Sequence, residues 1–306
     1  MLVLIVGITG NLGLKLADAL IRRGHQVRGA SRSGDKVPEA DMQKLESFHQ
    51  TNSWYDVNTL RRAVRGVDAV VCAYAPMPWL ALEAELLLVR IMEEEGVTRF
   101  IPSTWNLDWS QLSWGQAPYY DVFLALKRQL ELSSTVKPMY IFVGVLSEVF
   151  FSVPGHGGFS PSNNGVWDGE AKRALVWGSG HEKWQITTEN DAAEFTAELV
   201  LDLTKETGTY RFCSYEKSTR EMAQVYEQIR GIKVTLDHAG SLDDLRDVAS
   251  TAVEELGLKR FWEWMGYFYQ IFQLDGTVNM DKLDNSCYPE VQATSLEDFL
   301  RLHTEI

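Results

Sequence analysis

Cysteine is scarce in this chain, and its positions argue against two common kinds of site. Only Cys72, Cys213 and Cys287 occur in 306 residues, and they lie far apart in the sequence. An odd number of widely spaced cysteines indicates neither a disulfide framework nor a metal site. His156 and His181 also lack a partner at the spacing of metal ligands, so we expect no bound metal and reduced thiols in a cytoplasmic protein.

Internal repeats and long runs of charge are also missing, and we expect no targeting segment. The net charge of −13 disfavours a nucleic-acid partner, because neutralising phosphates requires clustered lysine and arginine. The apolar residues 1–10 carry no basic region and are too short to cross a bilayer. We therefore expect a buried strand there and no membrane partner. With 45% hydrophobic residues, the chain can bury a large core.

What the sequence does contain is an alternation of apolar runs and helical patterns. This alternation predicts an α/β fold with a Rossmann-type, doubly wound parallel sheet. We assign residues 1–153 to this nucleotide-binding domain. The expected strands cover 2–6, 26–30, 68–73, 99–102 and 139–145, and the expected helices cover 12–23, 59–64, 81–95 and 122–133.

Residues 154–306 are predicted to form a smaller C-terminal α/β part that caps the sheet and binds substrate, with some segments returning to the first sheet. A long loop is expected over 154–169, which is rich in Gly, Pro, Ser and Asn. Asp191 is expected to cap a helix, and Ser218 with Glu221 resembles a capping box. The remaining elements are strands over 174–177 and 208–213 and helices over 191–203, 222–230, 242–256, 261–273 and 296–302.

Three glycines between the first strand and the first helix indicate a dinucleotide site. Gly7 permits a tight turn, Gly10 lets the backbone approach a diphosphate, and Gly13 allows close packing of helix on strand. The amides at the start of the helix add a partial positive charge. The predicted cradle consists of Gly7, Thr9, Gly10, Asn11, Leu12 and Gly13.

The residues after the second strand favour NADP(H) over NAD(H). NAD-selective sites place an acid here to hold the ribose 2′-hydroxyl, whereas this chain has Ser31 and Arg32, with Lys36 nearby. Arg32 suits a 2′-phosphate because its guanidinium is planar, and the alternative is a solvated surface arginine. The expected cofactor site further includes Ser53, Ala75 and Ser103.

Several segments resemble the NmrA-like and isoflavone-reductase-like group of atypical short-chain dehydrogenases. They are residues 7–13, 31–32, 97–103, 208–212, 288–291 and 295–300. The resemblance implies an NADP-binding Rossmann domain with a small C-terminal substrate domain. Plant members of this group reduce phenolic or phenylpropanoid compounds, fungal members act in alkaloid or polyketide pathways, and NmrA itself is a regulator without catalysis. The fold therefore leaves the function open.

The usual catalytic tyrosine of short-chain dehydrogenases has no counterpart here. At the first and last positions of their Tyr-x-x-x-Lys pattern this chain has Phe123 and Lys127. A phenyl ring cannot transfer a proton. Lys127 fits the lysine that holds the nicotinamide ribose, or it is a plain surface lysine. The resemblance to isoflavone-reductase-like enzymes implies a lysine at the position of Phe123, and that lysine is missing too. Tyr119, Tyr120 or Glu148 is expected to supply the proton chemistry, unless these side chains only pack.

Ten tryptophans are many for this length, and several follow the predicted parallel strands. Ligands of such sheets bind at the carboxyl ends of the strands, where indole faces can stack on aromatic rings. Ordinary core packing is the alternative for each of them. The expected substrate site comprises Trp79, Thr104, Trp105, Trp109, Trp114, Phe123 and Glu148, and Gly155, Gly157 and Gly158 are expected to form a mobile lid.

Three functions remain open from the sequence. The first is an NADPH-dependent oxidoreductase of secondary metabolism that reduces a C=N or an activated C=C bond of a bulky aromatic, indole-alkaloid-like substrate. The second is a cyclase that uses the same pocket for Pictet–Spengler-type ring closure. The third is a non-catalytic NADP sensor. In each case a monomer or a homodimer is expected.

Overall fold

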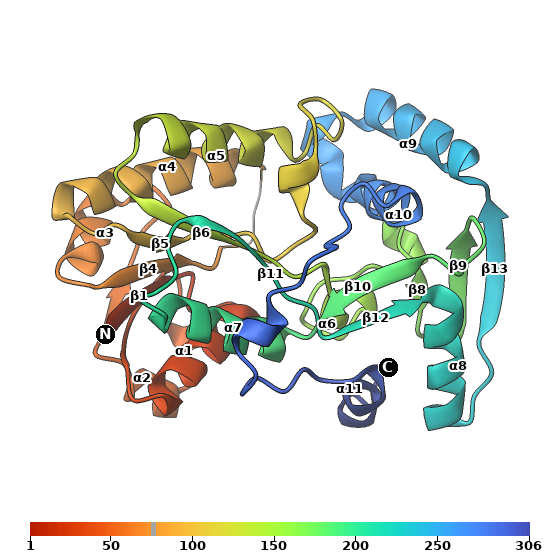
Figure 1. The fold of residues 1–306 in the computed structure, drawn as a ribbon, viewed down its shortest axis with the longest axis horizontal. Helices are drawn as coiled ribbons and strands as arrows, with labels where there is room; N and C mark the ends of the chain where they lie inside the picture. Colours follow the sequence, from red (N-terminus) through yellow and green to blue (C-terminus); the bar gives the residue numbers. More distant parts are fainter. Residues whose placement is uncertain (75–77) are drawn as a thin grey trace.

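Seven parallel strands form the central sheet of the computed structural model, which describes residues 1–74 and 78–306 (Figure 1). Their order is β11-β6-β5-β4-β1-β2-β3. The order reverses at β1, so β1 and β4 flank the point where such sheets bind ligands. The predicted Rossmann-type α/β fold is confirmed. The strands are β1 (Leu2–Val6), β2 (Gln26–Ser31), β3 (Ser47–Gln50), β4 (Ala69–Cys72), β5 (Arg99–Ile101), β6 (Lys137–Phe142) and β11 (Gly208–Arg211).

Helices cover both faces of this sheet, which is why its central strands are almost continuously apolar. In β4 every residue is buried. One face carries α1 (Asn11–Arg22) and α7 (Glu189–Leu201), and the other carries α3 (Val57–Val64), α4 (Pro78–Glu95) and α5 (Asp121–Ser133). The two layers are visible below and above the sheet in Figure 1.

Two elements from the second half of the chain, β11 and α7, belong to the seven-stranded sheet and to the helices that cover it. Strand β11 pairs in parallel with β6 at the edge of the sheet. Helix α7 packs along α1, and Arg23 on α1 forms ion pairs with Glu194 at 2.8 Å and Glu198 at 2.6 Å on α7. The N-terminal sheet is therefore completed by residues beyond 153.

The chain leaves the first sheet at Gly144. A single strand over 139–145 was expected, but β6 ends at Phe142 and β7 (Val145–Leu146) joins a second sheet. Gly144 has φ +68°, and a Cβ there would lie 2.0 Å from the carbonyl oxygen of Gln185. Only glycine permits this turn, because an L side chain is disfavoured at this φ and has no room.

The C-terminal part contains two three-stranded sheets, ordered β12-β10-β7 and β13-β9-β8. Their core is strongly aromatic and includes Trp167, Trp184 and Trp264. The strands are β8 (Trp167–Asp168), β9 (Arg173–Trp177), β10 (Lys183–Thr187), β12 (Tyr215–Ser218) and β13 (Thr235–Gly240). The helices are α6 (Ser147–Phe150), α8 (Thr219–Arg230), α9 (Leu242–Leu256), α10 (Met265–Asp275) and α11 (Leu296–Leu302), and the short α2 (Glu39–Met42) lies in the first half.

Two expected helices differ from the observed ones. Helix α7 begins at Glu189 and is capped by Thr188, whose Oγ1 accepts from the backbone N–H of Asp191 at 3.0 Å. Asp191 is thus inside the first turn and is not the cap. The expected helix over 261–273 is divided at Trp264, where φ is −136°, into a 3₁₀ turn (Leu258–Glu263) and α10.

Strands β3, β8, β10, β12 and β13 were not predicted, and β8 lies within the loop that was expected over 154–169. These strands contain no continuous apolar run, because buried and exposed residues are mixed along them. In β13, for example, no residue is fully buried. By contrast, the capping box of Ser218 and Glu221 is present, and α9 and α11 have the expected bounds.

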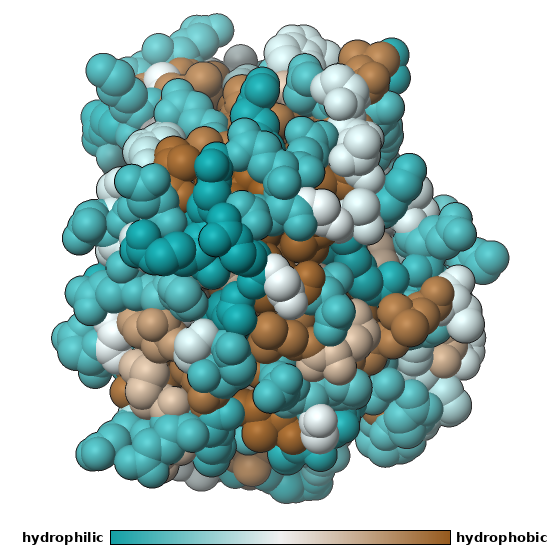
Figure 2. All heavy atoms as spheres, turned by 90° about the vertical axis from the view of Figure 1, so that its left-hand side faces the viewer, coloured by the Kyte–Doolittle hydropathy of each residue, from teal (hydrophilic) through white to brown (hydrophobic). Residues whose placement is uncertain are grey.

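The outer face of the N-terminal half is largely hydrophilic, with hydrophobic side chains in separate spots (Figure 2). Scattered apolar side chains of this kind are ordinary on a protein surface. Within residues 1–74 and 78–306, no helix has both the length and the apolar character needed to cross a membrane.

Candidate functional site

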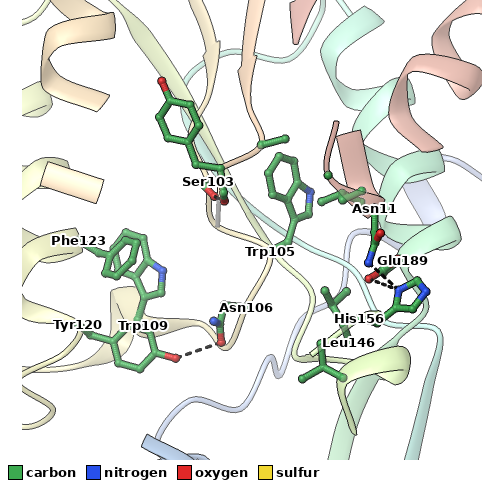
Figure 3. Close-up of a pocket in the computed structure, with 15 residues that line it drawn as sticks. Asn11, Ser103, Trp105, Asn106, Trp109, Tyr120, Phe123, Leu146, His156 and Glu189 are labelled. Carbon is green, nitrogen blue, oxygen red and sulfur yellow. Dashed lines mark hydrogen bonds and ion pairs between the residues drawn. The ribbon is translucent and has the colours of Figure 1, made fainter. Parts of the chain in front are cut away.

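A cavity of about 290 Å³ opens at the carboxyl edge of the sheet, beside β1 and β4 (Figure 3). Its wall comes from the glycine loop, the segments after β4 and after β5, the start of α5, β7 and α6 with the loop that follows them, and the start of α7. This convergence follows from the fold, because the carboxyl ends of parallel strands meet at one edge.

The glycine loop has the geometry that a diphosphate cradle requires. Gly7 has φ +89°, and a Cβ there would lie 2.5 Å from the carbonyl oxygen of Ala73. A Cβ on Gly13 would lie 2.7 Å from the oxygen of Gly7, so helix and strand meet directly. Around Gly10 no atom would come closer than 3.5 Å, which leaves the loop open to a ligand. Helix α1 has no side-chain cap, so its first amides face this opening.

The end of β2 is tied to the loop and presents two cations. Ser31 Oγ lies 2.7 Å from Thr9 Oγ1. Arg32 and Lys36 are exposed, and neither forms an ion pair with any residue in 1–74 or 78–306. In a chain of net charge −13, unpaired cations beside a glycine loop are suited to a phosphate.

Trp54 belongs to this region, although the sequence analysis did not select it. The guanidinium of Arg32 lies over its ring at 4.5 Å, and the ring meets Tyr74 edge-on at 4.2 Å between centroids. Ser53, which was selected, accepts from the backbone N–H of Tyr55 through Oγ at 3.2 Å and lies in the same exposed turn. Ala75 lies outside the described residues.

Of the first three residues that follow Pro102 after β5, Ser103 and Trp105 face the cavity and Thr104 does not. Ser103 lines it and donates through Oγ to the carbonyl oxygen of Tyr74 at 2.7 Å. Trp105 lines it with its ring held by a hydrogen bond from Nε1 to Thr196 Oγ1 at 2.8 Å. Thr104 is buried and accepts from the backbone N–H of Ile141 at 2.9 Å, so it supports β6 and does not line the cavity.

Aromatic side chains make the opposite wall. Trp109 and Phe123 both line the cavity, with ring centroids 5.6 Å apart. Tyr120 also lines it, and burial raises the pKa of its phenol well above the usual value. Tyr119 is buried behind this wall, stacked on Phe261 at 4.7 Å, and does not line the cavity. Phe123, which the sequence pattern matched to the usual catalytic tyrosine, therefore places a phenyl ring in the pocket.

Two expected site residues, Lys127 and Trp114, are not brought to this cavity. The ammonium of Lys127 forms an ion pair with Glu131, and its side chain lines a separate hollow with Lys137 and Tyr140. Trp114 is 71% exposed. The geometry thus gives no support to Lys127 as a ribose ligand or to Trp114 as a substrate contact. The side chain of Trp79 lies outside the described ones.

Glu148 is also set back from the cavity. It is 3% exposed, and its Oε2 accepts from the backbone N–H of Glu189 at 2.9 Å. Burial raises the pKa of Glu148, and the neighbouring charge of Glu189 raises it further. The carboxyl group therefore supports the start of α7 instead of facing a ligand.

His156 and Glu189 line the cavity, and the sequence analysis connected neither of them to it. His156 Nδ1 lies 2.9 Å from Glu189 Oε1 and 2.9 Å from Asn11 Nδ2. Lys15 holds the other oxygen of Glu189 at 2.9 Å, and Asn11 Nδ2 also donates to the carbonyl oxygen of Gly155 at 3.0 Å. The loop expected to be a lid is thus fastened to the first turn of α1 (Figure 3).

Glu85 on α4 is a buried acid behind Ser103. It is 1% exposed, and burial raises its pKa to about 8, although the backbone N–H of Ser103 lies 3.4 Å from its Oε2 and acts in the other direction. The carboxyl group is therefore mostly uncharged at neutral pH.

The parallel sheet, the glycine loop and the cavity at the switch point together define a Rossmann-type α/β protein with a ligand site at its carboxyl edge. Residues 1–300 match the NmrA-like family, and the chain belongs to that family. This confirms the resemblance to the NmrA-like and isoflavone-reductase-like group.

Among characterised relatives, the bifunctional pinoresinol-lariciresinol reductase of Linum perenne is 27% identical over 98% of each chain. Two solved structures share the fold over nearly all of both chains. AtPrR2 with NADP⁺ and (+)-pinoresinol has a TM-score of 0.76 at 21% identity over 98% of each chain. The complex of leucoanthocyanidin reductase with NADPH from Vitis vinifera has a TM-score of 0.78 at 17% identity over 100% of each chain.

Proposed function

We propose that this chain is an NADPH-dependent reductase of a small aromatic molecule. The observation that carries the proposal is that the glycine loop and an aromatic wall meet in one cavity. The named relatives are reductases, and two proteins of the same fold were solved with NADP⁺ or NADPH. A bound NADPH supplies hydride to an acceptor beside its nicotinamide ring.

The chain's own residues fit that cofactor. The amides of Asn11 and Leu12 face the open side of the loop and suit a diphosphate. Arg32 and Lys36 suit the 2′-phosphate, with Trp54 holding the guanidinium of Arg32 in place. Trp105, Trp109 and Phe123 offer ring faces to an aromatic acceptor and exclude water from it.

The acceptor is expected to be an activated C=C or a C=N bond, because Phe123 cannot supply a proton. Tyr120 keeps its proton at physiological pH, since burial raises its pKa. The cavity of about 290 Å³ lies at the small end of ligand pockets. A nicotinamide ring and a bulky acceptor therefore require the loop around His156 to open.

The two other functions receive less support from this geometry. Ring closure of the Pictet–Spengler type needs a carboxylate beside the aromatic wall. Glu148 is set back, and Glu189, the carboxylate that lines the described cavity, is engaged by Lys15 and His156. A non-catalytic sensor has no need of an aromatic wall next to the nucleotide loop.

The test uses the purified full chain. Calorimetric titration is expected to show tight NADPH binding and weaker NADH binding, and NADPH absorbance is expected to fall when an aromatic enone or an aromatic imine is added. Turnover of any one of them supports a reductase. Absence of affinity for both nucleotides contradicts the proposal.

A further inference from the structure

Asn106 lies in the loop after β5 and lines the cavity between the aromatic residues of the wall (Figure 3). Its Oδ1 accepts three hydrogen bonds: from the backbone N–H of Leu107 at 2.7 Å, from Tyr120 Oη at 3.0 Å and from Tyr269 Oη at 2.7 Å. A backbone N–H can only donate, so the atom that faces Leu107 must be the oxygen. The orientation of the amide is therefore fixed by its hydrogen-bond partners.

The nitrogen of the same amide is left for a ligand. Across residues 1–74 and 78–306, no acceptor takes a hydrogen bond from Asn106 Nδ2. Nδ2 is also not closed off from solvent, in contrast to the hydroxyl of Tyr140, which is buried without a partner. Asn106 thus presents an accessible N–H donor from the wall of the cavity, and its carbonyl oxygen is held by Tyr120, directly before α5, and by Tyr269 on α10.

The surroundings of this amide favour a neutral oxygen acceptor over a cation. Glu189, Asn11 and His156 lie together and apart from Asn106 in Figure 3. Glu189 is already paired with Lys15 at 2.9 Å. A cationic amine beside Asn106 would meet N–H groups and no free carboxylate of the described wall, whereas a carbonyl oxygen would meet a donor held in place.

We propose that Asn106 is the residue that binds and polarises a carbonyl oxygen of the substrate, and that the substrate is an aromatic molecule whose reducible C=C bond is conjugated to that carbonyl. This rests on the proposed function and decides between its two acceptor types. As the β-carbon gains hydride from NADPH, the C=C π pair moves towards the carbonyl oxygen. The enolate takes a proton at its α-carbon from solvent water when the pocket opens, which completes the saturated ketone.

The role of Asn106 in this reaction is electrostatic. Negative charge develops on the carbonyl oxygen as the π pair moves, and a donor already oriented by Tyr120, Tyr269 and Leu107 stabilises it without reorganising. Because that donor replaces an acid, the absence of a tyrosine or lysine at Phe123 does not block the reaction.

The test is the substitution Asn106→Asp, which keeps Oδ1 and its three donors and replaces only the free N–H₂ with an oxygen. Two probes are titrated into the cofactor-free full chain and followed by quenching of tryptophan fluorescence: benzylideneacetone, an aromatic enone, and cinnamylamine, an aromatic cation. The enone is expected to bind about tenfold more weakly to the variant, and the amine more tightly, since a carboxylate repels one and attracts the other. Asn58→Asp, an exposed position on α3, is the matched control and should change neither.

Equal affinity of the folded variant and the native chain for the enone overturns the proposal, as does failure of the native chain to bind the enone. If Asn106→Asp does not fold, Tyr269→Phe is used instead. It removes one clamp and leaves the N–H₂, so enone affinity is expected to fall by a smaller factor, and no fall overturns the proposal. NADPH titration of the same samples is expected to be unchanged within about twofold. If the native chain binds the enone through Asn106 but does not bind NADPH, the proposed reductase function is contradicted. The proposal that Asn106 binds the carbonyl oxygen is then still supported.

Discussion

Arg32 is the single residue on which the preference for NADPH in the proposed site depends. Its guanidinium is stacked on Trp54 and has no carboxylate partner in the described chain, so a 2′-phosphate would be its counter-ion. A hydrogen bond to a charged group contributes about 1.5–3 kcal/mol. We therefore expect Arg32→Ala to weaken NADPH binding by roughly 10- to 100-fold and NADH binding by no more than about twofold.

Isothermal titration calorimetry with both nucleotides measures this difference. Arg301→Ala, at a largely exposed position on α11, is the matched control and should leave both affinities unchanged. Equal losses for NADPH and NADH in Arg32→Ala would show that the arginine does not bind the 2′-phosphate.

At the scale of elements, the loop from Val153 to Gly158 borders the cavity through His156 and is the segment that we expect to move as a lid. It is fastened through His156 to Glu189 and Asn11, and through the carbonyl oxygen of Gly155 to Asn11. His156 Nδ1 either donates to Glu189 or accepts from Asn11, so His156→Ala removes one hydrogen bond, which contributes about 1 kcal/mol. Amide exchange in 153–158 is expected to accelerate by about fivefold, while exchange in β1 and β4 stays the same.

Hydrogen–deuterium exchange followed by mass spectrometry tests this expectation. His181→Ala, at an exposed position outside the cavity, should have no effect on the loop. Unchanged protection of the loop in His156→Ala would mean that packing alone holds it closed.

At the scale of the whole molecule, the two halves depend on each other. Without residues 154–306, β6 would lose β11 and become an edge strand, and α1 would lose the cover of α7. The buried side chains Phe195, Leu199 and Val200 of α7 belong to the same apolar cluster as β1. We expect residues 1–153 alone to lack a cooperative unfolding transition, because a large apolar face would be exposed.

Circular dichroism during thermal unfolding distinguishes the two forms. The full chain is expected to unfold in a single cooperative transition. A fragment of residues 1–153 that unfolds just as sharply would show that the Rossmann part is an independent domain.

Features that depend on neighbouring residues could be predicted from the sequence. The apolar run of β1, the glycines at positions 7, 10 and 13, and the capping box of Ser218 and Glu221 are all local patterns. They arise from hydrogen bonds and steric contacts within a few residues of chain, so they can be recognised from the order of the residues alone.

Features that join distant segments could not be predicted. Asn106 and Tyr269 are 163 residues apart, and His156 and Glu189 are 33 apart. Lys127 matched a motif by spacing, yet its helix turns its ammonium to Glu131 and away from the cavity. Helical spacing alone does not determine which face of α5 meets the ligand, because that depends on packing against α4 and the sheet.

By itself, the sequence determined the parallel sheet, the glycine loop and the family of this protein, because periodicity and turn chemistry act over short stretches of chain. Only the tertiary structure decided which side chains share the cavity: it brought His156, Glu189 and Asn106 in and left Lys127, Glu148 and Trp114 out. The physical reason is that strand order and helix packing set the distances between remote residues, and those distances decide which groups can exchange a hydrogen bond.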